Sequence, residues 1–252
     1  MAVIEATMPR RNVSCVECPL RAQGPFKQYA NADIKFLDHL KKEHLSLTAG
    51  RDIIVAGDPR PPLYTLFSGW AFRFKMLSDG RRQILNFLLP GDPIGFQAHM
   101  FDAAPHSVQA LTDVQLCGFH RGKIWDLYRH HPELAFDLTW LTAREEGVVD
   151  ESLLSVGRRN ALESVGALLI HLCKRAEALG LRRNGGVQFP LTQQHIADAL
   201  GLSLVHTNKS MRKLSRLGLF EIKDGSLEMM NGRAVERLAQ YFDEEPKLRP
   251  LL

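Results

Sequence analysis

The sequence predicts an α+β protein in which a small antiparallel β-roll is followed by a long helix and a helix-turn-helix. Short apolar runs fill Ser46–Phe119, several with period-two alternation, and Gly, Pro and Asp separate them. Apolar residues then recur at helical spacing over 131–156 and 158–181. Residues 192–217 carry the caps and turn glycine of two short helices in tandem.

The segments that flank the roll follow from local composition. Residues 1–30 contain several Pro and Gly and predict irregular structure, whereas 32–45 predicts a short amphipathic helix. The stretch 131–156 has no proline after Pro132, and its length of about 25 residues favours pairing with a partner helix. Its apolar residues lie near one stripe, formed by Leu134, Leu138, Leu141, Val148 and Val149.

Composition excludes several classes of protein. Apolar residues make up 45% and charged residues 24% of 252 residues, which is typical of folded globular chains. No run approaches the roughly 20 apolar residues of a membrane span, and the start MAVIEATMPRR lacks a signal-peptide core. Four unevenly spaced cysteines do not form a disulfide framework. We therefore expect a cytoplasmic protein that does not contact membranes.

Charge is concentrated at one end of the chain. Residues 1–157 contain 17 Lys and Arg against 18 Asp and Glu, whereas residues 158–252 contain 15 against 10. The basic C-terminal part favours a polyanionic partner. No nucleophile elbow or phosphate-binding loop is present, so we do not expect an enzyme.

The helix-turn-helix is the strongest motif. Thr192 and Ser203 are placed to cap two helices, and Gly201 stands where a left-handed turn must separate them. Between Ser203 and Leu217 there are four Lys and Arg and no acidic residue. Such a helix fits the major groove of double-stranded DNA, with its first turns at base edges and later cations at phosphates.

The inward positions of the two helices, and the outward positions of the second helix, are predicted from helical spacing. The residues expected to point inward are Ile196, Leu200, Leu202, Met211, Leu214 and Leu217. The residues expected to point outward are Val205, His206, Lys209, Arg212, Lys213 and Arg216. Thr207 and Ser210 occupy positions where apolar residues are usual, so either the helix is seated slightly differently or their hydroxyls bond back to helix carbonyls.

Three segments together resemble the Crp/Fnr superfamily of bacterial transcription regulators. They are LYTLFSGWAFRFKMLSDGRRQILNFLLPGDPIG (63–95), HSVQALTDVQLCGF (106–119) and TQQHIADALGLSLVHTNKSMRKLSRLGL (192–219). The resemblance implies a cyclic-nucleotide-binding-like jelly roll, a dimerisation helix and a C-terminal winged helix-turn-helix. It divides the chain into a cysteine-containing segment 1–30, a sensory roll 31–130, a dimerisation helix 131–156 and a DNA-binding domain 157–252.

The resemblance also implies contacts and partners. Thr192, Gln193 and Ser203 match positions that contact phosphates, and Leu204, Val205 and Lys209 match positions that contact bases. Because Leu204 and Val205 donate no hydrogen bonds, His206 and Lys209 are left as the polar readers, and Arg212 and Lys213 as phosphate contacts. The implied partners are a two-fold symmetric operator, a second copy of the chain bound through 131–156, and RNA polymerase.

The roll lacks the charges that a cyclic nucleotide needs. The family's nucleotide site supplies an Arg before a Ser and a Glu just after PGDxxG, whereas His106, Ser107 and Phe96 stand at these positions. A buried cyclic phosphate requires a positive partner. We therefore expect a signal other than cyclic AMP.

Three cysteines resemble those of the oxygen-sensing Fnr branch. Cys15, Cys18 and Cys117 match positions that hold a [4Fe–4S] cluster, but the third N-terminal ligand position falls on Gly24, so the set is incomplete. Three alternatives stay open. The pair could form a reversible disulfide, bind zinc with His39 and His44, or have no redox role. Cys173 is expected in the core.

Two other classes of function remain as rivals. One is a redox or iron–sulfur protein that uses Cys15 and Cys18 without binding DNA. The other is a small-molecule-binding module that acts through a protein partner. The basic, acid-free second helix favours a homodimeric DNA-binding transcription regulator over both, although the sequence does not distinguish an activator from a repressor.

Overall fold

The computed structural model describes residues 13–101, 103–241 and 248–252. Two 3₁₀ turns, η1 (Cys15–Glu17) and η2 (Pro19–Ala22), lead into α1 (Asn31–Leu40). The helix predicted over 32–45 ends at Leu40, because the following residues form strand β1 (Lys41–Leu47) and pair with β8. The cross-strand ladder outweighs the helical spacing of the apolar residues in this stretch.

Residues 41–119 form the predicted roll from two four-stranded sheets, in the orders β1-β8-β3-β6 and β2-β7-β4-β5. Every pairing within them is antiparallel, which confirms the predicted architecture. A short helix, α2 (Phe96–Met100), follows β6. The remaining strands are β2 (Asp52–Ile54), β3 (Leu63–Ser68), β4 (Ala71–Met76), β5 (Arg82–Leu88), β6 (Pro93–Ile94), β7 (Ser107–Ala110) and β8 (Val114–Phe119).

The long helix α4 (Pro132–Gly157) follows the turn η3 (Arg121–Lys123) and helix α3 (Ile124–His130). Its predicted stripe is only partly available to a partner. Leu134, Leu138 and Leu141 are buried in the core of their own subunit against α1, α3 and the roll. The exposed face of α4 lies on a different side of the helix from these three leucines and includes Phe136 and Leu154.

The C-terminal domain begins with α5 (Ala161–Ala178), which Asn160 caps together with Glu163. The structure forms a short hairpin where a loop was expected at 182–186. The domain's other elements are β9 (Arg182–Arg183), β10 (Gly186–Gln188), α6 (Gln193–Leu200), α7 (Leu204–Arg216), β11 (Phe220–Lys223), β12 (Ser226–Met229) and α8 (Gly232–Ala239). The four strands form a sheet in the order β11-β12-β10-β9, which supplies the wing.

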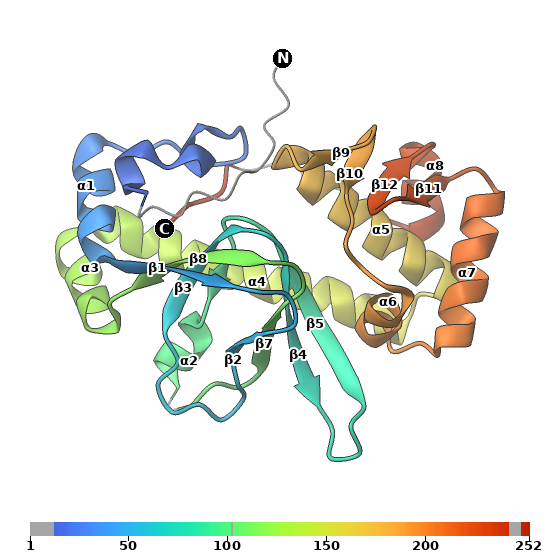
Figure 1. The fold of residues 1–252 in the computed structure, drawn as a ribbon, viewed down its shortest axis with the longest axis horizontal. Coiled ribbons are helices and arrows are strands. Elements are labelled where there is room, and N and C mark those ends of the chain that lie inside the picture. The colour runs from blue at the N-terminus through green and yellow to red at the C-terminus, as the bar shows by residue number, and fades with distance from the viewer. Residues whose placement is uncertain (1–12, 102, 242–247) are drawn as a thin grey trace.

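The roll and the C-terminal domain lie side by side along α4, with α6 facing the β4–β5 hairpin (Figure 1). Arg82 of β5 donates two hydrogen bonds to Asp198 of α6, at 2.9 and 2.7 Å. The neighbouring Gln83 side chain donates to the carbonyl of Ala199. None of the helices in the described part of the chain is long and apolar enough to cross a bilayer.

A buried carboxylate between β5 and β6 of the roll connects the roll to the C-terminal domain. Asp92, which has no exposed surface, accepts hydrogen bonds from Arg175 of α5 at 2.5 Å and from Arg249 at 2.7 Å. Arg144 of α4 lies 3.6 Å from the same carboxylate. Burial raises the pKa of Asp92, but the guanidiniums of Arg175, Arg249 and Arg144 more than offset this and hold it well below its usual range.

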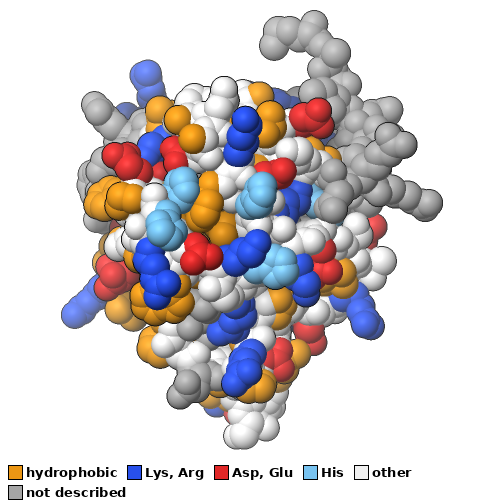
Figure 2. All heavy atoms as spheres, turned by 90° about the vertical axis from the view of Figure 1, so that its left-hand side faces the viewer, with side chains coloured by type: hydrophobic (Ala, Val, Ile, Leu, Met, Phe, Trp, Pro, Cys, Tyr) orange, Lys and Arg blue, Asp and Glu red, His pale blue; other side chains and the backbone are white. Residues whose placement is uncertain are grey.

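The surface at the α1–α3 end has a mixed character. Figure 2 shows cationic, acidic and histidine side chains interspersed there with small apolar areas. Trp125 of α3 is 63% exposed, whereas Trp70 is fully buried. A face of mixed sign does not favour a polyanion, in contrast to the outer face of α7.

Candidate nucleic-acid interface and sensory sites

Local sequence builds the turn between α6 and α7 as predicted. Thr192 accepts a hydrogen bond from the amide of His195, and its own amide donates to the His195 ring, which closes a capping box. Gly201 adopts a left-handed φ of +63°, which residues with a side chain disfavour. Ser203 then caps α7 by accepting from the amide of His206. The first residues of α7 are thereby fixed relative to α6.

The proposed DNA contacts lie together on the exposed side of this motif. Val205 is 74% exposed, and cations follow it along the same face of α7. All nine predicted contact residues are exposed, namely Thr192, Gln193, Ser203, Leu204, Val205, His206, Lys209, Arg212 and Lys213. The structure thus leaves exposed nine residues that the sequence spreads over 22 positions.

The inner face of α7 agrees with the prediction except at two points. Met211 and Leu214 are buried, as are Thr207 and Ser210. The Thr207 hydroxyl has no hydrogen-bond partner among the described residues, so the expected bond back to a carbonyl is not formed there. Leu217 is 57% exposed because it follows the last turn of the helix and is not packed beneath it.

Asn208 is a candidate contact that sequence reasoning missed. It lies beside Lys209 and lines the same shallow groove on α7 as Val205, Arg212 and Arg216. Its amide can both donate to and accept from a base edge, which neither Leu204 nor Val205 can do. The available signal was its spacing of three and four residues from other outward positions.

The three cysteines predicted as metal ligands converge at the junction of the N-terminal segment and the roll. Cys18 and Cys117 pack against one apolar cluster, and Cys15 and Cys117 pack against another. Burial raises the pKa of the Cys15 thiol to about 11 and that of Cys117 to about 12, and the neighbouring cysteines contribute to both shifts. We call Cys15, Cys18 and Cys117 the cysteine group.

His44 adjoins this group, and the sequence pointed to it only through the zinc alternative. It pairs with Cys117 across the β1–β8 ladder, and its ring nitrogens lie 3.9 and 4.0 Å from the Cys117 sulfur. Burial and the ammonium of Lys41 lower the pKa of His44, which favours its neutral ring. Its pairing with Cys117 was not predictable, because the sequence placed His44 at the end of a helix.

The structure does not bring together the ligands of the zinc alternative. His39 is exposed, and its ring contacts the carbonyl of Lys35. Within residues 13–101, 103–241 and 248–252, no three His, Cys, Asp or Glu side chains are arranged to share a single metal ion. The four cysteines are free thiols, and Cys173 is buried in the core as expected.

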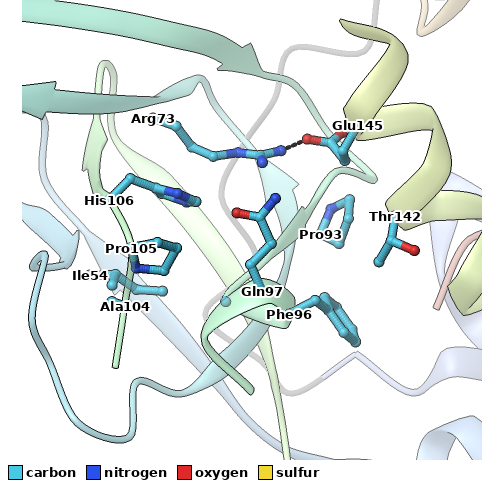
Figure 3. A pocket seen from close by; sticks show the side chains of 11 residues that line it. Ile54, Arg73, Pro93, Phe96, Gln97, Ala104, Pro105, His106, Thr142 and Glu145 are labelled. Carbon is cyan, nitrogen blue, oxygen red and sulfur yellow. Dashed lines mark ion pairs between the residues drawn. The ribbon is translucent and has the colours of Figure 1, made fainter. Parts of the chain in front are cut away.

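The cavity in the roll is small, and the cation that lines it, Arg73, is already paired. The volume of the cavity is about 30 Å³, which leaves room for only a few water molecules. Figure 3 shows the Arg73 guanidinium directed at Glu145 of α4, with which it forms a buried ion pair. Burial, followed by the charges of Arg73 and Lys75, lowers the pKa of His106 to about 4, so its ring offers no positive charge.

Comparison with known proteins agrees with both parts of this architecture. A model of the cyclic nucleotide-binding domain matches residues 44–131, and a model of the Crp-like helix-turn-helix domain matches residues 163–241. Nitrogen fixation regulation protein FixK of Bradyrhizobium diazoefficiens is 30% identical over 229 residues, covering 89% of this chain and 93% of the relative. Transcriptional activator protein FnrL of Cereibacter sphaeroides is 29% identical over 212 residues, covering 83% and 84%.

A solved structure gives the same picture. FixK2 from Bradyrhizobium japonicum superposes with a TM-score of 0.71 at 25% identity, covering 78% of this chain and 96% of that one. A roll of the cyclic-nucleotide-binding type joined to a helix-turn-helix defines a class of DNA-binding transcription regulators. The chain belongs to the Crp/Fnr family of this class, whose members bind DNA and act as dimers.

Proposed function

We propose that this regulator binds a two-fold symmetric operator as a homodimer held by α4, and that a redox or oxygen signal at the cysteine group switches it. The observation that carries the proposal is the convergence of Cys15, Cys18 and Cys117, although about a hundred residues separate the first two from the third.

The exposed face of α4 supports the dimer. Its residues recur with alternating steps of four and three, as a two-stranded coiled coil requires. These residues, which we call the dimer stripe, are Phe136, Trp140, Ala143, Gly147, Asp150, Leu154 and Gly157. The small residues Ala143 and Gly147 allow two helices to approach closely at the centre of the stripe.

The outer face of α7 supports binding in the major groove of DNA, with few hydrogen bonds to base edges. Leu204 and Val205 offer apolar contact to thymine methyl groups, while His206 and Lys209 offer hydrogen bonds to base edges. Arg212 and Lys213 lie farther along the helix, where phosphates are met. Two copies must present these helices to successive major grooves about 34 Å apart.

The residues at the cysteine group fit a bound iron–sulfur cluster in their donor chemistry. Cys15, Cys18 and Cys117 would provide three thiolates, and the neutral His44 imidazole next to Cys117 is a candidate fourth ligand. The cluster would supply sensitivity to oxygen. Lys41 and Arg21 contribute positive charge that favours the ionised thiolates, since both lower the pKa of Cys15 and Cys117.

The test is the metal content and absorption of protein purified without oxygen. We expect iron, inorganic sulfide and a brown colour that air bleaches, and we expect Cys15→Ser and Cys117→Ser to abolish all three. Cys173→Ser is the matched control, since Cys173 lies in the DNA-binding domain core. Colourless, iron-free wild-type protein that still binds its operator would reject the cluster and leave a thiol switch.

The remaining partner and place in the cell follow from the same function. A regulator of transcription meets RNA polymerase, and we propose that the polymerase is its protein partner in the cytoplasm. The exposed Trp125 and Tyr128 of α3, whose ring centroids are 5.9 Å apart, form an apolar surface away from the DNA-binding face that is available for such a contact.

A further inference from the structure

Residues 248–252 lie on the roll beside the N-terminal segment, at the opposite end of the molecule from α8 (Figure 1). We call this segment the strap. Leu248 is 60% exposed, whereas Arg249, Leu251 and Leu252 are buried. A five-residue segment with three large buried side chains is docked in a complementary site and does not simply lie across the surface.

The backbone of the strap pairs with the N-terminal segment. The Arg249 amide donates to the carbonyl of Pro25, and the Lys27 amide donates to the carbonyl of Arg249, both at 2.8 Å. These two bonds form a short parallel bridge between Phe26 and Arg249. Farther along, the buried Thr65 hydroxyl of β3 donates to the Leu252 carbonyl at 2.6 Å.

The Arg249 side chain anchors the strap to the buried carboxylate. Its guanidinium lies over the Phe26 ring, 5.0 Å from the centroid, and donates to Asp92 at 2.7 Å. Asp92 also accepts from Arg175 of α5, so the strap and the DNA-binding domain share one anchor. A buried guanidinium without Asp92 would leave an unpaired charge, which makes the docked position specific.

The apolar side chains of the strap fill the two clusters that support the cysteine group. Leu251 belongs to the cluster against which Cys18 and Cys117 pack, and Leu252 belongs to the cluster against which Cys15 and Cys117 pack. We propose that the roll and the N-terminal segment form a docking site for the strap, and that the docked strap fastens the cysteine-bearing segment to the roll. Its part in signalling rests on the proposed function, whereas its docking does not.

Hydrogen exchange of the full-length protein tests the docking directly. We expect Arg249→Ala and Leu251→Ser to speed amide exchange of residues 13–29 by about tenfold or more, because both remove contacts that hold this segment closed. Leu248→Ser is the matched control in the same strap, and we expect it to exchange at the wild-type rate. Exchange of α7 amides reports whether each variant remains folded.

Unchanged protection of residues 13–29 in a folded Arg249→Ala or Leu251→Ser protein would overturn the proposal. If Leu251→Ser does not fold, Arg249→Ala decides the matter, since Arg175 and Arg144 still face Asp92 in that variant. The measurement needs neither metal nor DNA. A failure of the strap is thus distinguished from a failure of cysteine sensing, which the iron content and operator binding report.

Discussion

At the scale of single residues, Asp92 connects three parts of the chain through buried contacts. It is fully buried and faces guanidiniums from α4, α5 and the strap. A buried carboxylate of this kind is costly unless it is paired with cations. The sequence showed it only as part of PGDPIG, which is equally typical of a turn, because its partners lie 52 to 157 residues away.

Asp92→Asn is expected to destabilise the protein by about 3–5 kcal/mol at pH 7, since it leaves buried Arg175 and Arg249 without a counter-charge. The pKa of Asp92 is lowered by folding, so its stabilisation is complete above the unfolded value of about 3.9 and declines as pH falls below it. Urea unfolding at pH 7 and near pH 3 measures this. The difference in the free energy of unfolding between wild type and Asp92→Asn should be smaller near pH 3 than at pH 7.

The exposed Asp79, which pairs with Arg81 in the β4–β5 turn, provides the control. Asp79→Asn should leave unfolding at pH 7 nearly unchanged, because an exposed pair contributes little. An Asp92→Asn protein as stable as Asp79→Asn would show that the buried network is not needed for the fold.

Lys209 and Arg212 are expected to affect DNA binding differently. Lys209→Ala should weaken operator binding by about 1–3 kcal/mol and random DNA much less, because it removes a contact to a base edge. Arg212→Ala should weaken binding to operator and to random DNA alike. It should also reduce the slope of the logarithm of the binding constant against the logarithm of salt concentration by about one. Fluorescence anisotropy across a salt series measures both effects.

Lys42→Ala, on the exposed side of β1, is the control for a lost surface charge. It should leave both affinities unchanged. Equal losses on operator and random DNA for Lys209→Ala would contradict its assignment as a reader of sequence.

At the scale of elements, α4 shows where periodicity is ambiguous. The helix itself was predictable within a residue or so at each end, but its two apolar faces were not distinguishable by spacing alone. Leu134 and Leu141 face α1, α3 and the roll, and only the tertiary structure shows that Phe136 and Leu154 are left for a partner. Strand β1 was missed because its LSL alternation is too short to exclude a helix.

Leu154→Asp is expected to shift the protein from dimer to monomer at micromolar concentration. Leu154 is 42% exposed and falls in the dimer stripe, where its counterpart in the second copy would face it, so the substitution places two like charges close together at the contact. Sedimentation velocity measures the shift. We expect operator affinity to fall with it, because a monomer reaches one half-site only.

Thr142→Asp adds the same charge on an exposed part of α4 outside the dimer stripe, and it should remain dimeric. A Leu154→Asp protein that sediments as the wild-type dimer would place the interface elsewhere.

At the scale of the whole molecule, the architecture was predictable because each part has a strong local signature. The period-two roll, the long helix and the capped helical pair each follow from spacing and turn residues. The contacts between parts were not predictable, since Arg82 with Asp198 and Arg249 with Asp92 join residues 116 and 157 positions apart. The exposed face of α7 was therefore more fully predictable than the surroundings of the cysteine group.

Cyclic AMP is expected to leave the melting temperature unchanged at millimolar concentration. The roll cavity of about 30 Å³ has no room for a nucleotide, and Arg73 is engaged by Glu145. A ligand that binds the folded state raises its stability, so thermal denaturation with and without cyclic AMP measures this. A rise of several degrees would show that the cavity opens and that the nucleotide replaces the Glu145 contact.

The central claim is that a dimer reads an operator with paired α7 helices under control of the cysteine group. Hydroxyl-radical footprinting of oxygen-free and air-exposed protein tests it in one experiment. We predict two protected half-sites about one helical turn apart that weaken on exposure to air in the wild type, and no response to air in Cys117→Ser. A single protected half-site, or an identical response to air in wild type and Cys117→Ser, would contradict the account.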